Sequence, residues 1–459
     1  MTAQAPTAGT TGLPPRTGIV KVVFASLVGT ATEWYDFFLY GSAAALVFGA
    51  LFFPSSDPIT GTLLAFGTYA LGFAARPLGG VVFGHFGDRV GRKKMLVVSL
   101  MMMGLATIAI GLLPTYATIG VAAPILLLVC RLVQGFAVGG EWGGAVLMAA
   151  EHGRDDQRGF WSSWPQAGVA LGNLLATGVL FVLSAVQSDA DFNAWGWRIP
   201  FLLSAVLVFV GLWVRLTIEE SPVFKEAQAE IAEKKDEANH VPILEVIRNY
   251  PREVLVAMGM RLCENTSYYI FTVIVLTYIV EFAKQDKGPV LQALLIGSVV
   301  HFVWIPVVGA LSDRVGRRPL YLAGAVGVAI WSFVFFDLLD AGTPGKTILA
   351  IVVGLMLHAL MYSPQAAFFS ELFGTSVRYT GASVGYQLAS IFAGAVAPIV
   401  AVKLLASGDG RNTTAVAVYV TITAVITVVA VLFAKETRNT SLRHDRVVRG
   451  AHAEAPAEV

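Results

Sequence analysis

Long apolar runs alternate with short polar segments along almost the whole chain. About 20 consecutive apolar residues are enough to cross a bilayer as an α-helix. Twelve such runs can be delimited, at residues 19–48, 59–83, 95–113, 119–149, 160–184, 199–216, 253–282, 290–311, 320–339, 347–370, 380–404 and 413–434. Several exceed the length of a perpendicular crossing, so we expect tilted helices or helical extensions beyond the hydrocarbon. The pattern predicts an all-α membrane protein with twelve transmembrane helices.

The basic residues indicate which side of the membrane each loop faces. An even number of helices puts both termini on one side. If the loops that follow odd-numbered helices are external, the external basic residues are Arg198, Lys284, Lys287, Lys346, Lys403 and Arg411. Most other basic residues then lie in the remaining loops and the tails, and cytoplasmic loops are those enriched in Lys and Arg. We expect a multi-pass protein of the plasma (cytoplasmic or inner) membrane with both termini in the cytoplasm.

Composition excludes several functional classes. The 459 residues are 56 % hydrophobic and 14 % charged, too apolar for a soluble globular protein and suited to a lipid bilayer. The formal net charge of +1 gives no electrostatic reason to expect a nucleic-acid partner. The sequence has no Gly-x-x-x-x-Gly-Lys-Ser/Thr loop and no His/Cys/carboxylate cluster with metal-ligand spacing. We therefore expect neither an enzyme nor a bound cofactor or metal.

A charged turn occurs twice, each time between two apolar runs. Gly84-His-Phe-Gly-Asp-Arg-Val-Gly-Arg-Lys-Lys94 returns 225 residues later (309 − 84) as Gly309-Ala-Leu-Ser-Asp-Arg-Val-Gly-Arg-Arg-Pro319. The repeat predicts two pseudo-symmetric six-helix bundles that can open alternately to either side of a membrane. The predicted divisions are a cytoplasmic N-terminal tail (1–18), an N-terminal bundle (19–216), a cytoplasmic central loop (217–251), a C-terminal bundle (252–435) and a cytoplasmic C-terminal tail (436–459).

The paired turns also predict a latch between helix ends. Glycines permit tight turns, aspartates can accept hydrogen bonds from amides at a helix start, and arginines can reach carboxylates at other helix ends. The residues assigned to the latch are Gly84, Asp88, Arg89, Gly91, Arg92, Asp313, Arg314, Gly316, Arg317, Glu151, Arg158, Glu220, Glu371 and Arg378. Glu151 and Glu371 repeat at a spacing of 220 (371 − 151), as do Arg158 and Arg378. This second repeat favours a latch that breaks in one state over ordinary positive-inside anchors.

Several motifs resemble those of a known transporter group. The turn from Gly84 to Lys93 is similar to the loop signature of the major facilitator superfamily, and Arg131-Leu-Val-Gln-Gly135 resembles its fourth-helix motif. Motifs similar to those of the metabolite:proton symporter family are Glu33-Trp-Tyr-Asp-Phe37, Arg76-Pro-Leu-Gly-Gly80, Gly139-Gly-Glu-Trp-Gly143, Gly196-Trp-Arg-Ile-Pro200 and Val377-Arg-Tyr-Thr-Gly381. The first half is most similar to shikimate permeases, through Gly84-His-Phe-Gly-Asp88 and Gln134-Gly-Phe-Ala-Val-Gly-Gly-Glu-Trp-Gly-Gly144. The resemblance implies the major facilitator fold, a central cavity lined by helices 1, 4, 7 and 10, and uptake of small organic acids or compatible solutes.

Charged residues inside the predicted spans mark a candidate proton site, because a charge in hydrocarbon is costly and usually faces a partner or a wet cavity. Glu33 and Asp36 lie in the first span and Arg131 in the fourth. A rise of 1.5 Å per residue puts Asp36 and Arg131 at compatible depths. Desolvation favours a protonated aspartate and an adjacent arginine favours an ionised one. We expect Asp36 to carry the proton, Arg131 to be its switchable counter-charge and Glu33 to tune the site; a permanent Asp36–Arg131 salt bridge is the alternative.

Arg261, in the seventh span, is the predicted anchor for substrate. A guanidinium near the midplane suits bidentate binding of a carboxylate, although Arg261 could instead form a structural pair with Glu264. Arg76 is either a second anion ligand or a contact between helices 2 and 11. The other predicted substrate contacts are Glu264, Tyr40, Trp164, Gln166, His358, Tyr362, Tyr386 and Gln387. His301, also near mid-span, is more simply interpreted as a satisfied polar group than as a proton relay.

Together these features predict a symporter that imports a small organic anion with protons and acts as a monomer. A hydroxylated monocarboxylate such as shikimate is the favoured substrate. The alternatives are a di- or tricarboxylate such as α-ketoglutarate or citrate, and proline or betaine. An uncoupled facilitator or exchanger, and a receptor with a transporter-like fold, are the other functional classes.

Overall fold

The computed structural model describes residues 16–54, 57–90, 92–139, 146, 149–150, 154–217, 246, 248–373, 378–407, 411–438 and 440. Within these ranges the side chains of 16–18, 22, 84–90, 92–93, 96, 155, 215, 217 and 378–379 are not described. All the regular secondary structure in the described ranges is helical. The predicted all-α class is confirmed.

The N-terminal half contains six long helical segments. They are α1 (Arg16–Ala43), which continues through the π-helical turn η1 (Ala44–Phe48) into α2 (Gly49–Phe52), then α3 (Pro58–Val90), α4 (Arg92–Leu112), α6 (Ala122–Val138), α8 (Arg158–Val186) and α10 (Arg198–Thr217). Short elements between them are α5 (Tyr116–Ile119), η2 (Asp155–Gln157), α9 (Asp189–Asp191) and η3 (Phe192–Gly196). The first helix therefore extends beyond its predicted end at residue 48.

The C-terminal half repeats this arrangement. Its elements are α13 (Pro251–Tyr269), which continues through η5 (Ile270–Ile274), α14 (Val275–Thr277) and η6 (Tyr278–Phe282), then α15 (Lys287–Val315), α16 (Arg317–Asp340), α17 (Pro344–Leu372), α18 (Arg378–Ser390) with η7 (Ile391–Ala395) and α19 (Val396–Leu405), and α20 (Thr413–Phe433). Gly316 separates α15 from α16 with φ 109°, a conformation that favours glycine.

The length and apolar character of these helices fit a bilayer. Nine helices in the described ranges are long and apolar enough to cross a membrane, and Asp189–Gly196 with Arg198–Val214 form a further candidate bent by 51°. Val97–Leu112 and Ala122–Val138 are shorter apolar helices. In order along the chain, these segments correspond to the predicted spans. Many large apolar side chains are exposed on the outer surface, which is expected where lipid covers a protein.

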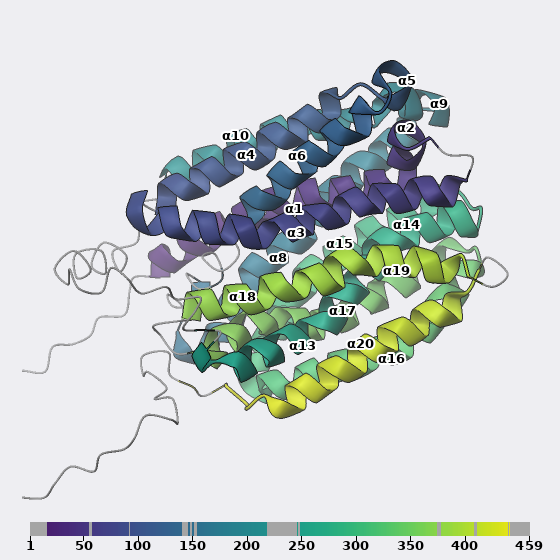
Figure 1. Ribbon diagram of the computed structural model, residues 1–459. Helices are drawn as coiled ribbons and strands as arrows, with labels where there is room; N and C mark the ends of the chain where they lie inside the picture. The colour runs from purple at the N-terminus through teal and green to yellow at the C-terminus, as the bar shows by residue number, and fades with distance from the viewer. Residues whose placement is uncertain are drawn as a thin grey trace, which may run out of the picture.

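The two halves of the chain form two adjacent groups of helices. Figure 1 shows the purple and blue helices of the N-terminal half on one side and the green and yellow helices of the C-terminal half on the other, with their long axes roughly aligned. Across the boundary, α8 packs against α15 and α17, while α3 packs against α18, η7 and α19.

Two predictions fall outside the described residues. The fourth span was expected to reach residue 149, but α6 ends at Val138 and residues 140–145 are not described. The short interfacial helix expected at 225–240 also lies outside the described ranges.

Candidate functional site

A small cavity lies at the boundary between the two groups of helices. It has room for about one water molecule. Its walls come from α1, α8, α13, α17 and α18, through Trp34, Val169, Arg261, Glu264, Asn265, Tyr268, Tyr269, His358, Tyr362 and Tyr386. The hydroxyls of Tyr268 and Tyr362 and the amide oxygen of Asn265 are buried and have no hydrogen-bond partner among the described residues. A lining of this kind is polar enough to accept a hydroxylated ligand once the cavity widens.

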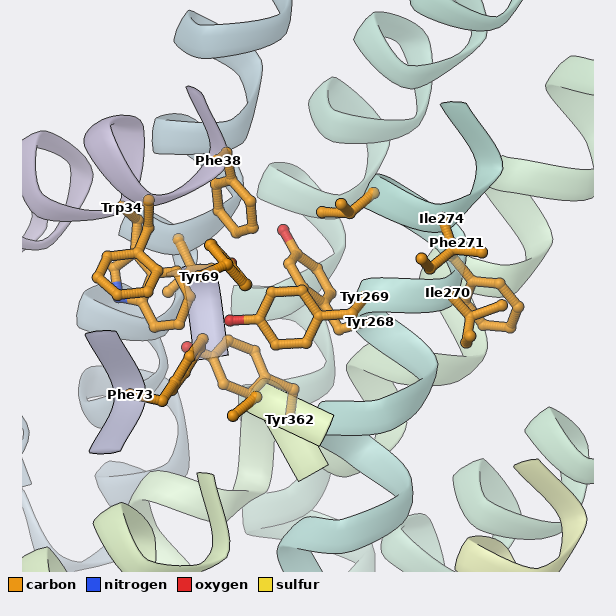
Figure 2. Close-up of a cluster of buried hydrophobic side chains, with 14 of the residues drawn as sticks. Trp34, Phe38, Tyr69, Phe73, Tyr268, Tyr269, Ile270, Phe271, Ile274 and Tyr362 are labelled. Atoms are coloured by element: carbon orange, nitrogen blue, oxygen red, sulfur yellow. The ribbon is translucent and has the colours of Figure 1, made fainter. Parts of the chain in front are cut away.

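Aromatic side chains from both halves meet beside this cavity. Figure 2 shows Trp34, Phe38, Tyr69 and Phe73 facing Tyr268 and Tyr269. The ring centroids of Phe38 and Tyr268 are 5.4 Å apart, and those of Phe73 and Tyr269 are 5.9 Å apart. Because these contacts join α1 and α3 to α13, the bundles cannot separate here without breaking them.

Arg261 lies in a dense hydrogen-bond network on the C-terminal side of the cavity. Its Nη1 donates to Glu264 Oε2 at 2.8 Å and to Gln365 Oε1 at 3.1 Å, and its Nε donates to Ser390 Oγ at 3.1 Å. The guanidinium also lies 3.3 Å from the centroid of Tyr386. In this state Arg261 therefore makes the pair with Glu264 that the sequence left as an alternative. Both residues line the cavity, so a ligand there competes directly for the guanidinium.

Asp36 is buried in the N-terminal bundle and has neutral hydrogen-bond partners. Thr107 Oγ1 donates to its Oδ2 at 2.7 Å, and Ser204 Oγ donates to its Oδ1 at 3.0 Å. Gln134 Nε2 in turn donates to Thr107 Oγ1 at 2.6 Å, and Arg131 Nη1 donates to Gln134 Oε1 at 3.0 Å. The carboxylate and the guanidinium are thus joined through two polar side chains.

The structure shows no direct Asp36–Arg131 ion pair among the described residues, because Asp36 bonds to Thr107 and Ser204 and Arg131 bonds to Gln134. The physical reason is competition from aromatic rings. The Arg131 guanidinium lies 4.0 Å from the centroid of Phe37 and 4.5 Å from that of Tyr40, which holds it away from the acid. Its Nε and Nη2 have no hydrogen-bond partner in the described part of the chain.

Arg76 occupies a similar aromatic setting. It is buried, with its guanidinium 4.0 Å from the Phe37 centroid and 4.1 Å from the Phe73 centroid. Its Nε and Nη2 also have no hydrogen-bond partner among the described residues. Glu33 is buried one helical turn before Asp36. The N-terminal bundle thus contains two arginines whose guanidiniums retain unused donors.

The remaining predicted contacts divide into those that line the cavity and those that do not. His358, Tyr362 and Tyr386 line it, together with Glu264. Gln166 lies behind the wall, where its Nε2 donates to the Tyr362 carbonyl at 3.1 Å. Outside the lining, Tyr40 bonds to Thr68, Gln387 Nε2 donates to the Gly139 carbonyl at 3.3 Å, and Trp164 packs against Phe160 and Phe302.

The second copy of the repeated turn joins the two bundles at one end of the helices. Asp313, at the end of α15, accepts hydrogen bonds from the amides of Gly159 (2.8 Å) and Phe160 (2.9 Å) at the start of α8. Its carboxylate also pairs with Arg317 at 2.8 Å. An anion at a helix N-terminus satisfies free amides and interacts favourably with the helix dipole.

A buried ion pair crosses the same boundary. Arg158 Nη1 lies 2.8 Å from Glu371 Oε1, and Arg317 Nη2 lies 3.4 Å from the same oxygen. Of the predicted latch residues, the four that the structure shows in contact are Arg158, Asp313, Arg317 and Glu371, and from here on the word latch means these four. At the opposite end of the helices, Lys287 on α15 pairs with Asp189 on α9. The bundles are therefore held together at both ends, and the cavity between them is closed.

Residues beyond α20 strengthen the latch. Glu436 accepts hydrogen bonds from the amides of Arg317 and Arg318, each at 3.0 Å, and so caps the first turn of α16. Thr437 donates to Glu371, and the Thr440 carbonyl accepts from Arg158 at 3.0 Å. Partial burial opposes ionisation of Glu436, but the bonds from backbone amides outweigh it and hold the pKa of Glu436 below its ordinary value.

Several residues that the sequence predicts for the latch are not described by the structure. Gly91, Glu151 and Glu220 lie outside the described residues, as do the side chains of Asp88, Arg89, Arg92 and Arg378. Gly84 lies in α3 and Gly316 at the turn before α16, and Arg314 is exposed beside Asp313. The first copy of the turn is thus untested, whereas the second forms the contacts described above.

Sequence reasoning missed several polar residues of these networks. Thr107, Gln134 and Ser204 form the surroundings of Asp36, and Glu436 and Thr437 bind the latch. Gln134 lies three residues after Arg131, a spacing that places both on neighbouring helix faces and could have suggested the bond. The described residues contain no group of three or more His, Cys, Asp or Glu side chains suited to a metal ion.

Comparison with known proteins identifies the family. Residues 21–447 match the sugar (and other) transporter family. The chain is 42 % identical over 428 residues to the inner membrane metabolite transport protein YhjE of Escherichia coli K12, covering 92 % of this chain and 95 % of that protein. It is 41 % identical over 419 residues to the shikimate transporter of the same organism, covering 91 % and 95 %.

A solved structure has the same fold. The proton:xylose symporter XylE, a major facilitator superfamily protein bound to 6-bromo-6-deoxy-D-glucose, matches with a TM-score of 0.73 at 17 % identity, covering 93 % of this chain and 98 % of that one. The predicted major facilitator fold is confirmed. The chain belongs to the sugar (and other) transporter family of the major facilitator superfamily and is a multi-pass membrane transporter, not an enzyme.

Proposed function

We propose that this protein is a proton-coupled symporter that imports a small organic acid anion by alternating access. The carrying observation is the closed cavity between the bundles, which Arg261 lines together with Tyr268 and Tyr362, whose hydroxyls have no hydrogen-bond partner among the described residues. With room for about one water molecule, the cavity admits a solute only after the bundles separate at one end.

A hydroxylated monocarboxylate such as shikimate is the favoured substrate. A guanidinium binds a carboxylate through two parallel hydrogen bonds. The hydroxyls of Tyr268 and Tyr362, which have no partner in the part of the chain that the structure describes, suit a polyhydroxylated ring. The 41 % identity to a shikimate transporter supports the same class. Arg76, with two unused donors, is a second candidate for the carboxylate.

A di- or tricarboxylate is the runner-up, because Arg261 and Arg76 together supply two positive charges near the bundle boundary. Proline or betaine is a further alternative within the resemblance. A zwitterion or a quaternary ammonium also needs an anionic or aromatic partner, which Glu264 and the aromatic side chains of the lining could supply. An uncoupled facilitator or exchanger remains the alternative of a different class.

Proton coupling is assigned to Asp36. Burial favours the protonated form of the Asp36 carboxyl, whereas the hydrogen bonds from Thr107 and Ser204 favour the ionised form, so the balance can change with the position of a nearby charge. Gln134, through Thr107, connects Asp36 to Arg131. If rocking of the bundles moves Arg131 onto Asp36, the proton leaves. At least one proton must accompany a monoanion, because net negative charge would otherwise move against the interior potential.

The transport topology follows from the same proposal. The nine long helices, the bent pair and the two shorter helices of the described residues make twelve crossings of the inner membrane. Both termini and the central loop then lie in the cytoplasm. The latch then lies at the cytoplasmic end and holds that side closed. The protein acts as a monomer, with the bundle divisions at 19–216 and 252–435.

Uptake by purified protein in proteoliposomes tests this proposal. Labelled shikimate, protocatechuate, α-ketoglutarate, citrate, proline and betaine are each offered with an imposed inward proton gradient. We expect shikimate or another hydroxylated monocarboxylate to accumulate, and accumulation to stop when an ionophore collapses the gradient. If the solute only equilibrates across the membrane, and does so equally with and without the ionophore, the protein is an uncoupled facilitator. If citrate or betaine alone accumulates, the proposed substrate class is wrong.

A further inference from the structure

A hydrogen-bond chain runs through the C-terminal bundle, apart from Asp36. His301 Nε2 lies 3.1 Å from His358 Nδ1, and His358 Nε2 lies 3.2 Å from Glu264 Oε1. The other oxygen of Glu264 binds Arg261 at 2.8 Å and Gln365 at 3.1 Å. All these side chains are buried, and they come from three different helices, α13, α15 and α17.

The direction of the hydrogen bonds in this chain follows from simple donor rules. Glu264, ionised beside Arg261, can only accept, so His358 Nε2 carries a hydrogen and donates. A neutral His358 then accepts at Nδ1, so His301 Nε2 donates to it. The remaining nitrogen, His301 Nδ1, is a bare acceptor, and it is buried with no hydrogen-bond partner in the described part of the chain. The chain therefore ends at a lone pair that is able to receive a proton.

The charges around this hydrogen-bond chain balance only while Arg261 is paired with Glu264. From α13 the titratable neighbours are Arg261, Cys263, Tyr268 and Tyr269, from α16 Tyr321, and from α17 and α18 Tyr362 and Tyr386. Among these described neighbours Arg261 is the one cation and Glu264 the one carboxylic acid, while Arg76 on α3 interacts with Tyr269 and Tyr386. Both histidine rings lie beside Tyr268 in tilted arrangements, with ring centroids 5.7 Å away for His301 and 4.7 Å away for His358.

A substrate carboxylate that takes Arg261 would leave Glu264 as a buried anion without a counter-charge. Removing one partner of a buried ion pair is strongly unfavourable, because the other charge stays buried without compensation. Protonation of Glu264 removes this cost. Arg261, Glu264 and His358 all line the same cavity, so a carboxylate that enters once the bundles have separated meets the ion pair directly.

We propose that His301, His358 and Glu264 form a second proton site, which is loaded when a carboxylate takes Arg261. A proton binds His301 Nδ1, His301 passes its Nε2 hydrogen to His358 Nδ1, and His358 passes its Nε2 hydrogen to Glu264 Oε1. One N–H bond forms and one breaks at each ring, and one O–H bond forms at the acid, with no change of oxidation state. The inference rests on the proposed carboxylate substrate, because the anion is what releases Glu264.

The first test needs no substrate. Arg261→Gln imitates the loss of the counter-charge, and infrared difference titration of the full-length protein detects protonated carboxylic acids. We expect a new acid carbonyl band in R261Q at neutral pH that is absent from wild type and from R261Q/E264Q. R252Q, at an exposed arginine of the same helix, is the matched control and should match wild type. If R261Q gains no band that depends on Glu264, the proposal is overturned.

The second test separates this inference from the proposed function. In proteoliposomes with the transported carboxylate, H301Q should lower the ratio of gradient-driven accumulation to exchange by about tenfold or more, while R252Q keeps the wild-type ratio. A wild-type ratio in H301Q, with wild type still accumulating substrate, would overturn the second proton site alone. If wild type accumulates no carboxylate, the proposed function fails, and the infrared result still decides whether Glu264 takes a proton when Arg261 is removed.

Discussion

Gly159 on α8 and Gly309 on α15 meet backbone to backbone at the latch. A Cβ atom on Gly159 would lie 2.6 Å from the Gly309 carbonyl oxygen, and one on Gly309 would lie 2.7 Å from the Gly159 carbonyl oxygen. Real Cβ atoms do not approach backbone so closely, so neither position tolerates a side chain in this state. The two bundles can close at this end only because both residues are glycine.

Gly309→Ala should therefore shift the protein toward the state in which the latch end is open. We expect Ser163→Cys, placed beside this crossing, to react at least several-fold faster with a maleimide when Gly309→Ala is also present, in a background lacking Cys130 and Cys263. Gly67→Ala is the control, since a Cβ there has no heavy atom within 4 Å. Equal labelling rates in the two variants would mean that the helices separate elsewhere.

Asp36→Asn should abolish accumulation and leave exchange partly intact, because an amide cannot release a proton. Loss of an essential proton-transfer group typically costs about 10²–10⁴-fold in rate. Gradient-driven uptake and counterflow, measured on the same proteoliposomes, check this. Asp156→Asn, at an exposed acid paired with Arg154, should behave as wild type. If D36N accumulates substrate as well as wild type, Asp36 is not the proton carrier.

Thr107→Val should weaken the communication between Asp36 and Arg131, because it removes the hydroxyl that joins Gln134 to the acid. A hydrogen bond to a charged group contributes about 1.5–3 kcal/mol, so we expect coupling to fall by roughly one to two orders of magnitude. The ratio of accumulation to counterflow measures it. Ser204→Ala removes an equivalent bond to Asp36 but keeps the Thr107 bridge, so its effect should be smaller. Equal losses in both variants would argue against a role for the bridge.

Glu436→Gln should lower stability at neutral pH and have little effect in acid. The pKa of Glu436 is depressed in the folded protein, so its contribution is present above the ordinary carboxyl pKa and is lost as pH falls through the folded value. Thermal unfolding of wild type and E436Q, compared from neutral to acidic pH, should show two Tm curves that converge in acid. A Tm difference between wild type and E436Q that stays constant with pH would mean that the substitution acts through packing and not through charge.

Much of the architecture could be predicted because it depends on local sequence patterns, namely apolar runs and a repeated turn. The apolar runs correspond to the observed helices, and the 225-residue repeat places Asp313 where it accepts the amides of Gly159 and Phe160. The candidate site was harder to predict. Asp36 and Arg131 lie at compatible depths, but depth does not fix a rotamer, and aromatic rings hold the guanidinium away.

Long-range contacts explain the other misses. Glu436 binds a helix that starts 119 residues earlier, and nothing in the spacing of Lys435-Glu-Thr-Arg438 indicates that partner. A lone histidine in an apolar helix predicts a satisfied polar group, and the His358 partner of His301 lies 57 residues away in sequence, too far for a local pattern to indicate it. The structure satisfies the Nε2 of His301 and leaves its Nδ1 without a partner among the described residues. Such half-satisfied groups become visible only once the helices are packed.

The Glu436 cap has a practical consequence for anyone shortening this polypeptide. A stop codon placed directly after α20 would look harmless by hydropathy, since it spares every apolar segment. It would nevertheless strip two amides at the start of α16 of their acceptor and free Glu371 from Thr437. Trimmed versions intended for crystallisation or sensor fusions should therefore retain at least residues 434–440, or they will report on an altered balance between conformations.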